Sequence, residues 1–223
     1  GTPDSPDVPA VRRYLREFLS DPRVIDMPAI PRWLFLNLFI LPFRPARSAK
    51  AYQSIWTDRG SPLLTHSRDL ARAVAERLGS GHIVELGMRY GNPSIQSAVD
   101  KLVSANCERI IILPLFPQYA SASTGSAVAK AIEILGGRWN VPPFEVRADF
   151  FDRPSFINAV AATAREKLKE LQPERVLMSF HGLPEHHAQK SEEPGFSECD
   201  IKSPCPAISS GNRYCYRAQC YET

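Results

Sequence analysis

The stretch RIIILPLFPQYASASTGSAVAKAIEILGG, residues 109–137, joins two patterns that together decide the fold class. Its first part, residues 109–115, is an apolar run with the length of a buried strand. Its last part, residues 124–135, has apolar residues at helical spacing and ends at Gly136 and Gly137. We therefore expect a buried strand and a helix, joined by a long loop.

Predicted strands and helices alternate along the rest of the chain as well. The predicted strands are residues 82–88, 144–150 and 174–180, and the predicted helices are residues 8–19, 61–78, 93–104 and 154–171. Ser61 is the expected cap of the helix that begins there, and Ser123 or Thr124 the expected cap of the helix in the opening stretch. Alternation of this kind is typical of a parallel sheet with crossover helices, so the sequence predicts an α/β fold.

Size, charge and hydropathy exclude several classes of protein. With 223 residues, 43% of them hydrophobic, the chain can bury a sizeable core, which excludes a peptide, a coiled coil and a disordered tail. Lys and Arg number 27 against 24 for Asp and Glu, and so weak an excess gives no support to nucleic-acid binding. No run approaches the roughly 20 apolar residues of a membrane-spanning helix.

The two ends of the chain predict a cytoplasmic protein that has been cut short. No secretory signal pattern opens the sequence, which begins at Gly1 rather than at a methionine. Residues 214–223 read as the first turns of a helix that stops without a cap. We therefore expect truncation at both the N- and the C-terminus.

The most hydrophobic run is WLFLNLFIL, from Trp33 to Leu41, and prolines stand on both sides of it. One interpretation is a buried helix. The other is an exposed apolar lip, around a greasy ligand or at a membrane surface. The sequence leaves both open.

Three segments follow predicted strands and are expected at the edge of the sheet where ligands bind. They are RYGNP at residues 89–93, the loop at residues 114–126, and HGLP at residues 181–184. The hydroxyl residues of the second loop could simply cap the next helix. With the N–H groups at a helix N-terminus they could also hold the carboxylate of an acidic ligand.

His181 ends a predicted buried strand, and Gly182 behind it permits an unusual backbone angle. A lone histidine is commonly structural, but this position favours a functional one. Imidazole can accept a proton near neutral pH or ligate a borderline metal such as Fe(II). His186 and His187 lie in a polar stretch, and we expect them to be solvated.

Several motifs occur in one characteristic order: GTPDSP (1–6), AYQSIW (51–56), GSPLL (60–64), MRYGNPSI (88–95), LPLFPQYASASTGS (113–126) and SFHGLP (179–184). In this the chain resembles the ferrochelatase family, lyases that insert Fe(II) into protoporphyrin in haem synthesis. The resemblance implies two Rossmann-like α/β domains with a porphyrin cleft between them. Here they would be residues 1–117 and an incomplete 118–223, which carries a Cys-rich insertion at residues 191–220.

The resemblance also implies roles for single residues. His181 would be catalytic, as the acceptor of pyrrole protons or as a ligand of the Fe(II) substrate. The porphyrin would be lined, and its propionates held, by Arg89, Tyr90, Phe116, Tyr119, Ser123 and Thr124. The run from Trp33 to Leu41 would be the family's apolar lip, in peripheral contact with the inner membrane. Family members continue beyond this chain and supply a glutamate opposite the histidine, so we expect the fragment itself to be inactive.

Four cysteines near the end of the chain form the pattern C-x5-C-x9-C-x4-C: Cys199, Cys205, Cys215 and Cys220. Four thiolates suit a 2Fe–2S cluster or zinc, and a disulfide framework is disfavoured in the cytoplasm. The lack of paired C-x2-C knuckles counts against zinc. The pattern therefore favours the cluster, which some ferrochelatases carry, with free thiols as an alternative. Cys107 stands apart and is expected to be an inert, packed thiol.

Two other functions stay open. A chelatase for cobalt or for another tetrapyrrole could share the fold, although such enzymes lack the PQY and TGS sequences found at residues 117–119 and 124–126. An iron–sulfur or zinc protein that senses redox state could also use this fold without inserting metal. The choice between protoporphyrin and coproporphyrin is open too, and the apolar run and the cysteines favour protoporphyrin.

Overall fold

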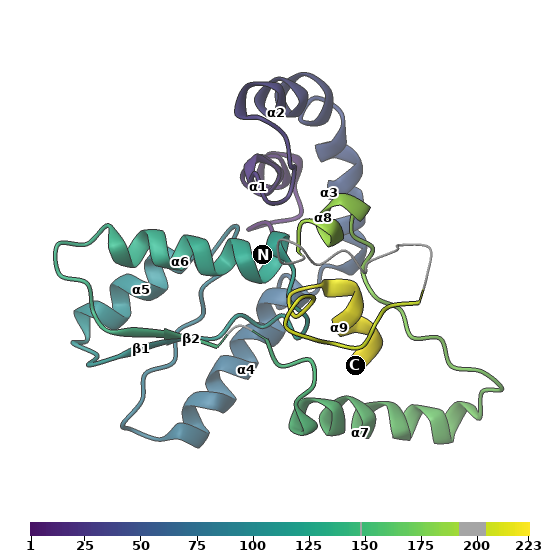
Figure 1. Cartoon of the computed structure of the whole chain (residues 1–223). Coiled ribbons are helices and arrows are strands. Elements are labelled where there is room, and N and C mark those ends of the chain that lie inside the picture. Colours follow the sequence, from purple (N-terminus) through teal and green to yellow (C-terminus); the bar gives the residue numbers. More distant parts are fainter. Residues whose placement is uncertain (148, 192–203) are drawn as a thin grey trace. The chain divides into compact units, whose positions relative to one another are not determined.

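The computed structural model describes residues 1–147, 149–191 and 204–223, which form two compact units. Unit 1 comprises Gly1–Ile112 and Ser126–Val146, and unit 2 comprises Leu113–Gly125 and Arg147–Thr223. Figure 1 labels the helices and strands of both units. The domain boundary between residues 117 and 118 stays a prediction.

The first part of unit 1 is helical. It contains α1 (Val8–Ser20), α2 (Ala29–Phe35), the π-helix η1 (Leu36–Ile40), α3 (Arg44–Ile55) and α4 (Pro62–Leu78). Helix α1 begins at Asp7, whose carboxylate accepts the Ala10 N–H at 2.8 Å, and Pro9 fits its first turn. Apolar side chains of α1 pack with those that follow in a first core, formed by Val11, Leu15, Leu19, Leu36, Leu41 and Ala49.

The second part of unit 1 is a small α/β layer. It contains α5 (Ile95–Ser104), β1 (Ile110–Ile112), α6 (Ser126–Gly136) and β2 (Phe144–Val146). The two strands are parallel, with Ile110 opposite Phe144. Figure 1 shows α5 and α6 over one face of this pair, and there Val99, Ile110, Ile134 and Leu135 form a second core. The predicted α/β fold with a parallel sheet is confirmed.

Unit 2 carries η2 (Ser121–Gly125), α7 (Pro154–Leu171), α8 (Glu185–Gln189) and α9 (Tyr216–Glu222). Helix α7 has the bounds that the sequence predicts. Helix α9 contributes the buried side chains Ala218 and Gln219, and it packs against the loop that precedes η2. Unit 2 is therefore organised around α9 rather than around a strand.

Two predicted strands do not form in the described part of the chain. Residues 82–88 make only an isolated bridge, from Met88 to Ser94, and residues 174–180 make no ladder. A strand requires a neighbour that pairs with its N–H and C=O groups, and an apolar sequence alone does not supply one. Leu177 is 91% exposed, so the prediction of a buried strand there was wrong.

The helix caps differ from the prediction as well. Ser61 stands at the cap position of α4, but its hydroxyl pairs with that of Thr2 at 2.8 Å rather than with the helix backbone. Ser123 bonds to a carbonyl of its own loop, and the Thr124 hydroxyl has no partner among the described residues. Neither residue caps α6, because the chain reaches that helix through η2, and Ser126 is its first residue.

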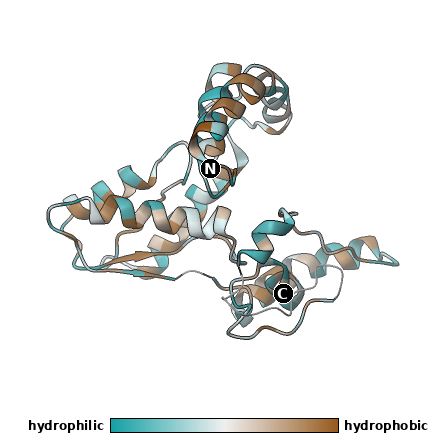
Figure 2. Ribbon diagram, turned by 45° about the horizontal axis from the view of Figure 1, so that its top comes forward, coloured by the Kyte–Doolittle hydropathy of each residue, from teal (hydrophilic) through white to brown (hydrophobic). Residues whose placement is uncertain are grey.

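The apolar run from Trp33 to Leu41 divides between core and surface. Leu36 and Leu41 are buried in the first core, whereas Trp33 and Phe39 are 62% and 64% exposed. Figure 2 shows hydrophobic and hydrophilic residues alternating along the helices. Within the described residues, every helix falls short of the length or the hydrophobicity that crossing a bilayer requires.

Candidate functional site

The loop at residues 88–93 is a tight turn that only glycine allows at its centre. The Met88 N–H bonds to the Pro93 carbonyl at 2.7 Å, which closes the turn. Gly91 has φ of +76°, and a Cβ atom there would lie 2.4 Å from the Thr2 carbonyl oxygen. The turn thus depends on Gly91 for both its backbone angle and its contact with the N-terminal segment.

Acidic residues of the N-terminal segment and α1 hold this loop. Asp4 accepts a hydrogen bond from the Asn92 side chain at 2.9 Å, and Glu17 accepts the Gly91 N–H at 2.9 Å. Asp21, which ends α1, accepts the Tyr90 hydroxyl at 2.9 Å. Tyr90, Gly91 and Asn92 thus bond to Asp21, Glu17 and Asp4, in the reverse order of the sequence.

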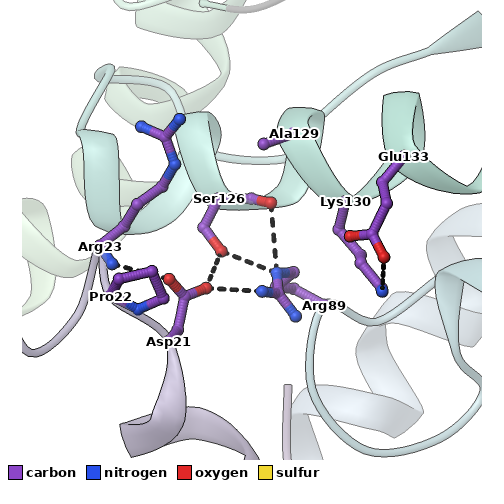
Figure 3. Close-up of a pocket in the computed structure, with 8 residues that line it drawn as sticks. All are labelled: Asp21, Pro22, Arg23, Arg89, Ser126, Ala129, Lys130 and Glu133. Carbon is purple, nitrogen blue, oxygen red and sulfur yellow. Dashed lines mark hydrogen bonds and ion pairs between the residues drawn. The ribbon is translucent and has the colours of Figure 1, made fainter. Parts of the chain in front are cut away.

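Asp21 is the centre of a buried cluster with Arg89, Tyr90 and Ser126, which we call the Asp21 cluster. Figure 3 shows its bonds to Arg89 and Ser126. Arg89 donates from Nη2 to Asp21 Oδ2 at 2.6 Å, and from Nε to the Ser126 hydroxyl at 2.7 Å. The Ser126 hydroxyl in turn donates to Asp21 Oδ2. The other oxygen of Asp21 accepts the Arg23 N–H at 2.8 Å.

Every acceptor and donor at the centre of this cluster has a complementary partner. Burial alone would raise the pKa of Asp21. The hydrogen bonds from Ser126, the Arg23 N–H and Tyr90, together with the charge of Arg89, outweigh burial and lower that pKa. Burial, aided by the negative charge of Asp21, raises the pKa of Tyr90 to about 12. At neutral pH the cluster therefore holds a carboxylate, a guanidinium and a neutral phenol.

A small cavity of about 190 Å³ adjoins the cluster in unit 1 (Figure 3). Asp21, Arg89 and Ser126 line one part of it, and Lys130 and Glu133 of α6 line another. Lys130 and Glu133 are paired at 2.8 Å, so they neutralise each other. The cavity is too small for a large planar ligand.

In unit 2, the loop before α6 is held by helix α9. The Tyr119 N–H donates to Gln219 Oε1 at 2.5 Å, and the Tyr119 ring lies 5.0 Å from that of Tyr214. Thr124 is fully buried, whereas Phe116 is partly exposed. Of the predicted porphyrin residues, Phe116, Tyr119, Ser123 and Thr124 thus share one loop held by α9.

His181 opens onto a larger cavity of about 660 Å³ in unit 2. Apolar side chains form part of its lining, among them Met178, Phe180 and Leu183, and Tyr216 and Cys220 of α9 form another part. The volume lies within the usual range of small-molecule pockets. The cavity brings an imidazole, apolar surface and the end of the cysteine-rich segment together.

Tyr216 connects His181 to that segment. It lies close enough to the His181 backbone and to the Cys220 thiol for both to affect its pKa. Burial, followed by the hydrogen bond to Cys220, raises the pKa of Tyr216 to about 12. Gly182 does not adopt a left-handed φ, so the backbone angle that glycine permits is not used there.

Cys205, Cys215 and Cys220 lie within electrostatic range of one another, but in the described part of the chain their sulfur atoms are not gathered as closely as the ligands of one metal ion. Burial raises the pKa of Cys205 and of Cys220, and the neighbouring Cys215 raises both further. Cys199 lies outside the described residues. Cys107 is a free, half-buried thiol just after the end of α5, where the chain turns toward β1, and its inertness stays a prediction.

Sequence reasoning missed four residues that organise these sites: Asp21, Ser126, Tyr216 and Gln219. Asp21 sits in an ordinary helix-ending Ser-Asp-Pro sequence, and its partners lie far along the chain. Gln219 is fully buried, and a buried glutamine in a short helix signals an internal hydrogen-bond partner. No local pattern distinguishes Tyr216.

Comparison with known proteins gives consistent results. The ferrochelatase family model matches residues 1–223, the whole chain. The ferrochelatase of Coxiella burnetii (strain Dugway 5J108-111) is 51% identical over 223 residues, which are all of this chain and 62% of that protein. The ferrochelatase of Legionella pneumophila (strain Corby) is 47% identical over 225 residues, again with all of this chain and 65% of that protein. The chain thus spans less than two thirds of the length of these relatives.

Proposed function

The chain belongs to the ferrochelatase family, and on that premise we propose that it is part of an enzyme that inserts Fe(II) into protoporphyrin IX to form protohaem. The observation that carries the proposal is the cavity of about 660 Å³ beside His181, with apolar side chains on its wall. An apolar wall suits a hydrophobic macrocycle, and an imidazole suits proton transfer. The activity is proposed for the complete protein.

The chemistry requires a proton acceptor. Insertion exchanges two pyrrole N–H protons for one Fe²⁺ ion, which must also shed its water ligands. A neutral imidazole is the common acceptor near pH 7, and in the proposed mechanism His181 takes a proton from a pyrrole nitrogen at its free ring nitrogen. Tyr216 of α9 lies next to the backbone of the segment that carries the ring.

The porphyrin contacts belong to the same proposal. Phe116 and Tyr119 would lie against the macrocycle, and Ser123 and Thr124 would bond to its polar groups. The buried Thr124 hydroxyl, which lacks a partner among the described residues, supports a polar ligand at this loop. Arg89 and Tyr90 would complete the set from loop 88–93, as proposed contacts with a propionate.

We further propose that the enzyme works in the cytoplasm, in peripheral contact with the inner membrane. The support is the set of exposed apolar side chains between residues 33 and 41, to which Trp33 and Phe39 contribute most. Their neighbours Leu36 and Leu41 are anchored in the core, so the exposed side chains are held on a rigid base. Such a surface suits a substrate that partitions into lipid.

We propose that Cys199, Cys205, Cys215 and Cys220 hold a 2Fe–2S cluster. The support is that the described thiols Cys205, Cys215 and Cys220 lie within electrostatic range of one another, and that thiolates are the ligands such clusters prefer. The cluster, when bound, would supply a one-electron redox centre. Binding would also deprotonate thiols whose pKa is raised in the free protein.

Anaerobic assay of the complete protein tests the main proposal. Fe(II) is supplied with protoporphyrin IX or with coproporphyrin, and the absorbance change of the porphyrin is followed. We expect protohaem formation, with protoporphyrin preferred. Tight porphyrin binding without metal insertion would contradict the proposal and favour a redox-sensing protein on this fold.

Elemental analysis tests the cluster separately. Protein purified without oxygen is expected to contain iron and acid-labile sulfide in equal amounts and to lose both in the Cys215→Ser variant. Cys107→Ser is the matched control and should keep both. Zinc in place of iron, or colourless protein free of both metals, would contradict the cluster.

A further inference from the structure

Asp21 occupies a position that connects three elements of unit 1. It ends α1, and its carboxylate bonds to Arg89 and Tyr90 on loop 88–93 and to Ser126 at the start of α6. Ser126 directly follows the loop that carries Tyr119 and Thr124. One carboxylate thus contacts residues at both segments from which the proposed porphyrin contacts come.

The bonds within the cluster fix the orientation of the Arg89 guanidinium. Asp21 engages Nη2 at 2.6 Å, and Ser126 engages Nε at 2.7 Å with its hydroxyl and at 3.2 Å with its carbonyl. Because the guanidinium is planar and its donors are fixed, these bonds decide where Nη1 points. Among the described residues, Nη1 has no hydrogen-bond partner, so its donors are left for a ligand.

The same bonds explain why a carboxylate is needed at position 21. Both oxygens of Asp21 act only as acceptors, one from Arg89, Tyr90 and Ser126, the other from the Arg23 N–H. An asparagine of the same size would have to place its NH₂ group against one of these donors. The charge of Asp21 also neutralises that of Arg89. Binding of a ligand by Arg89 therefore depends more on the orientation of its N–H donors than on net charge.

We propose that Asp21 is a positioning residue of the porphyrin site, which orients Arg89 and Tyr90 and fixes Ser126 at the start of α6. Asp21 itself is buried, and in this proposal it acts through Arg89 and Tyr90. The inference rests on the proposed function and extends it to a residue outside the motifs. Loss of Asp21 should weaken substrate binding, because the groups that it orients bind the substrate and the transition state equally.

The test uses the complete protein and its Asp21→Asn variant, assayed anaerobically with Fe(II) and protoporphyrin at a temperature well below both melting points. We expect the KM for porphyrin to rise about tenfold while kcat stays within about twofold. Asp69→Asn is the matched control. Asp69 carries an exposed ion pair on α4 with Arg59 at 2.9 Å, and its amide variant should leave KM and kcat unchanged.

Ser126→Ala is the second variant, for the case that Asp21→Asn does not fold. It removes the hydroxyl that accepts from Arg89 Nε but leaves the Ser126 carbonyl and the ion pair with Asp21, so KM should rise by a smaller factor in the same direction. The inference would be overturned if both variants had the wild-type KM, or if kcat fell while KM stayed unchanged. In either case the activity of the wild-type protein would still support the proposed function. Wild-type protein that neither binds nor metallates porphyrin would overturn both.

Discussion

Loop 88–93 of unit 1 and the His181 segment of unit 2 both follow predicted strands, yet the structure uses their polar side chains in opposite ways. Arg89 and Tyr90 are engaged by Asp21 and Ser126, and the Tyr90 ring is buried. The His181 imidazole instead opens onto a cavity. A side chain that most of its polar neighbours fix in place can orient a ligand, whereas one that faces open space can transfer protons.

The comparison predicts different costs for removing the two kinds of residue. Arg89→Met leaves the Asp21 carboxylate buried without its cation, and loss of one partner of a buried pair typically costs about 3–5 kcal/mol. The hydrogen bonds from Ser126 and Tyr90 to Asp21 remain, so we expect the free energy of unfolding to fall by about 3 kcal/mol. Denaturant unfolding of the complete protein measures it. A cost below about 1 kcal/mol would show that the Asp21 cluster does not stabilise unit 1.

Tyr90→Phe should cost less, about 1–2 kcal/mol at neutral pH, because it removes one hydrogen bond to a charged group. The variant also tests the raised pKa. A phenol with a folded-state pKa of about 12 contributes stability that is complete below pH 10 and is lost as the pH rises toward 12. The difference in stability between wild type and variant should therefore shrink over that range. A difference that is constant with pH would contradict the assigned environment of Tyr90.

Acid provides the corresponding test for Asp21. Its pKa is lowered in the folded state, so its contribution to stability is present above the ordinary aspartate pKa and is lost as the pH falls through the folded value. Wild type and Asp21→Asn should therefore converge in stability below about pH 4. The variant Asp69→Asn serves as the exposed reference. If the gap between wild type and Asp21→Asn widened on acidification, Asp21 would not be ionised in the folded protein.

His181→Ala gives the smallest expected change in stability, within about 0.5 kcal/mol, since an exposed side chain contributes little to packing. Urea unfolding at pH 7 compares it with wild type. A loss as large as that of Arg89→Met would show that His181 is a structural residue and would remove the contrast between the two segments.

Part of this arrangement could be predicted from the sequence, and the rest depended on distant contacts. The α/β class followed from local periodicity, as the stretch from residue 109 to 137 illustrates, because strand and helix patterns are properties of short windows. The prediction of a strand at residues 174–180 was wrong, because a strand forms only beside another strand to which it can hydrogen-bond. The apolar residues of the segment do not show whether such a neighbour exists.

The candidate sites divide in the same way. Arg89, Tyr90 and His181 stand in recognisable motifs, and the motif resemblance brought them forward. Asp21 stands outside them, and Ser126 lies in one but was not singled out, because the importance of both comes from a contact across 105 residues of sequence. The role of a buried carboxylate can be recognised only when its partners are known, so a structure is needed to find such positioning residues.

The central claim is that His181 performs the proton transfer in iron insertion, and one measurement tests it most directly. The complete protein is assayed anaerobically with Fe(II) and protoporphyrin as wild type, His181→Ala and His186→Ala, the last being a matched exposed histidine on α8. We predict that kcat falls by at least about a hundredfold in His181→Ala, with porphyrin still bound, and is unchanged in His186→Ala. Wild-type kcat in His181→Ala would contradict the account.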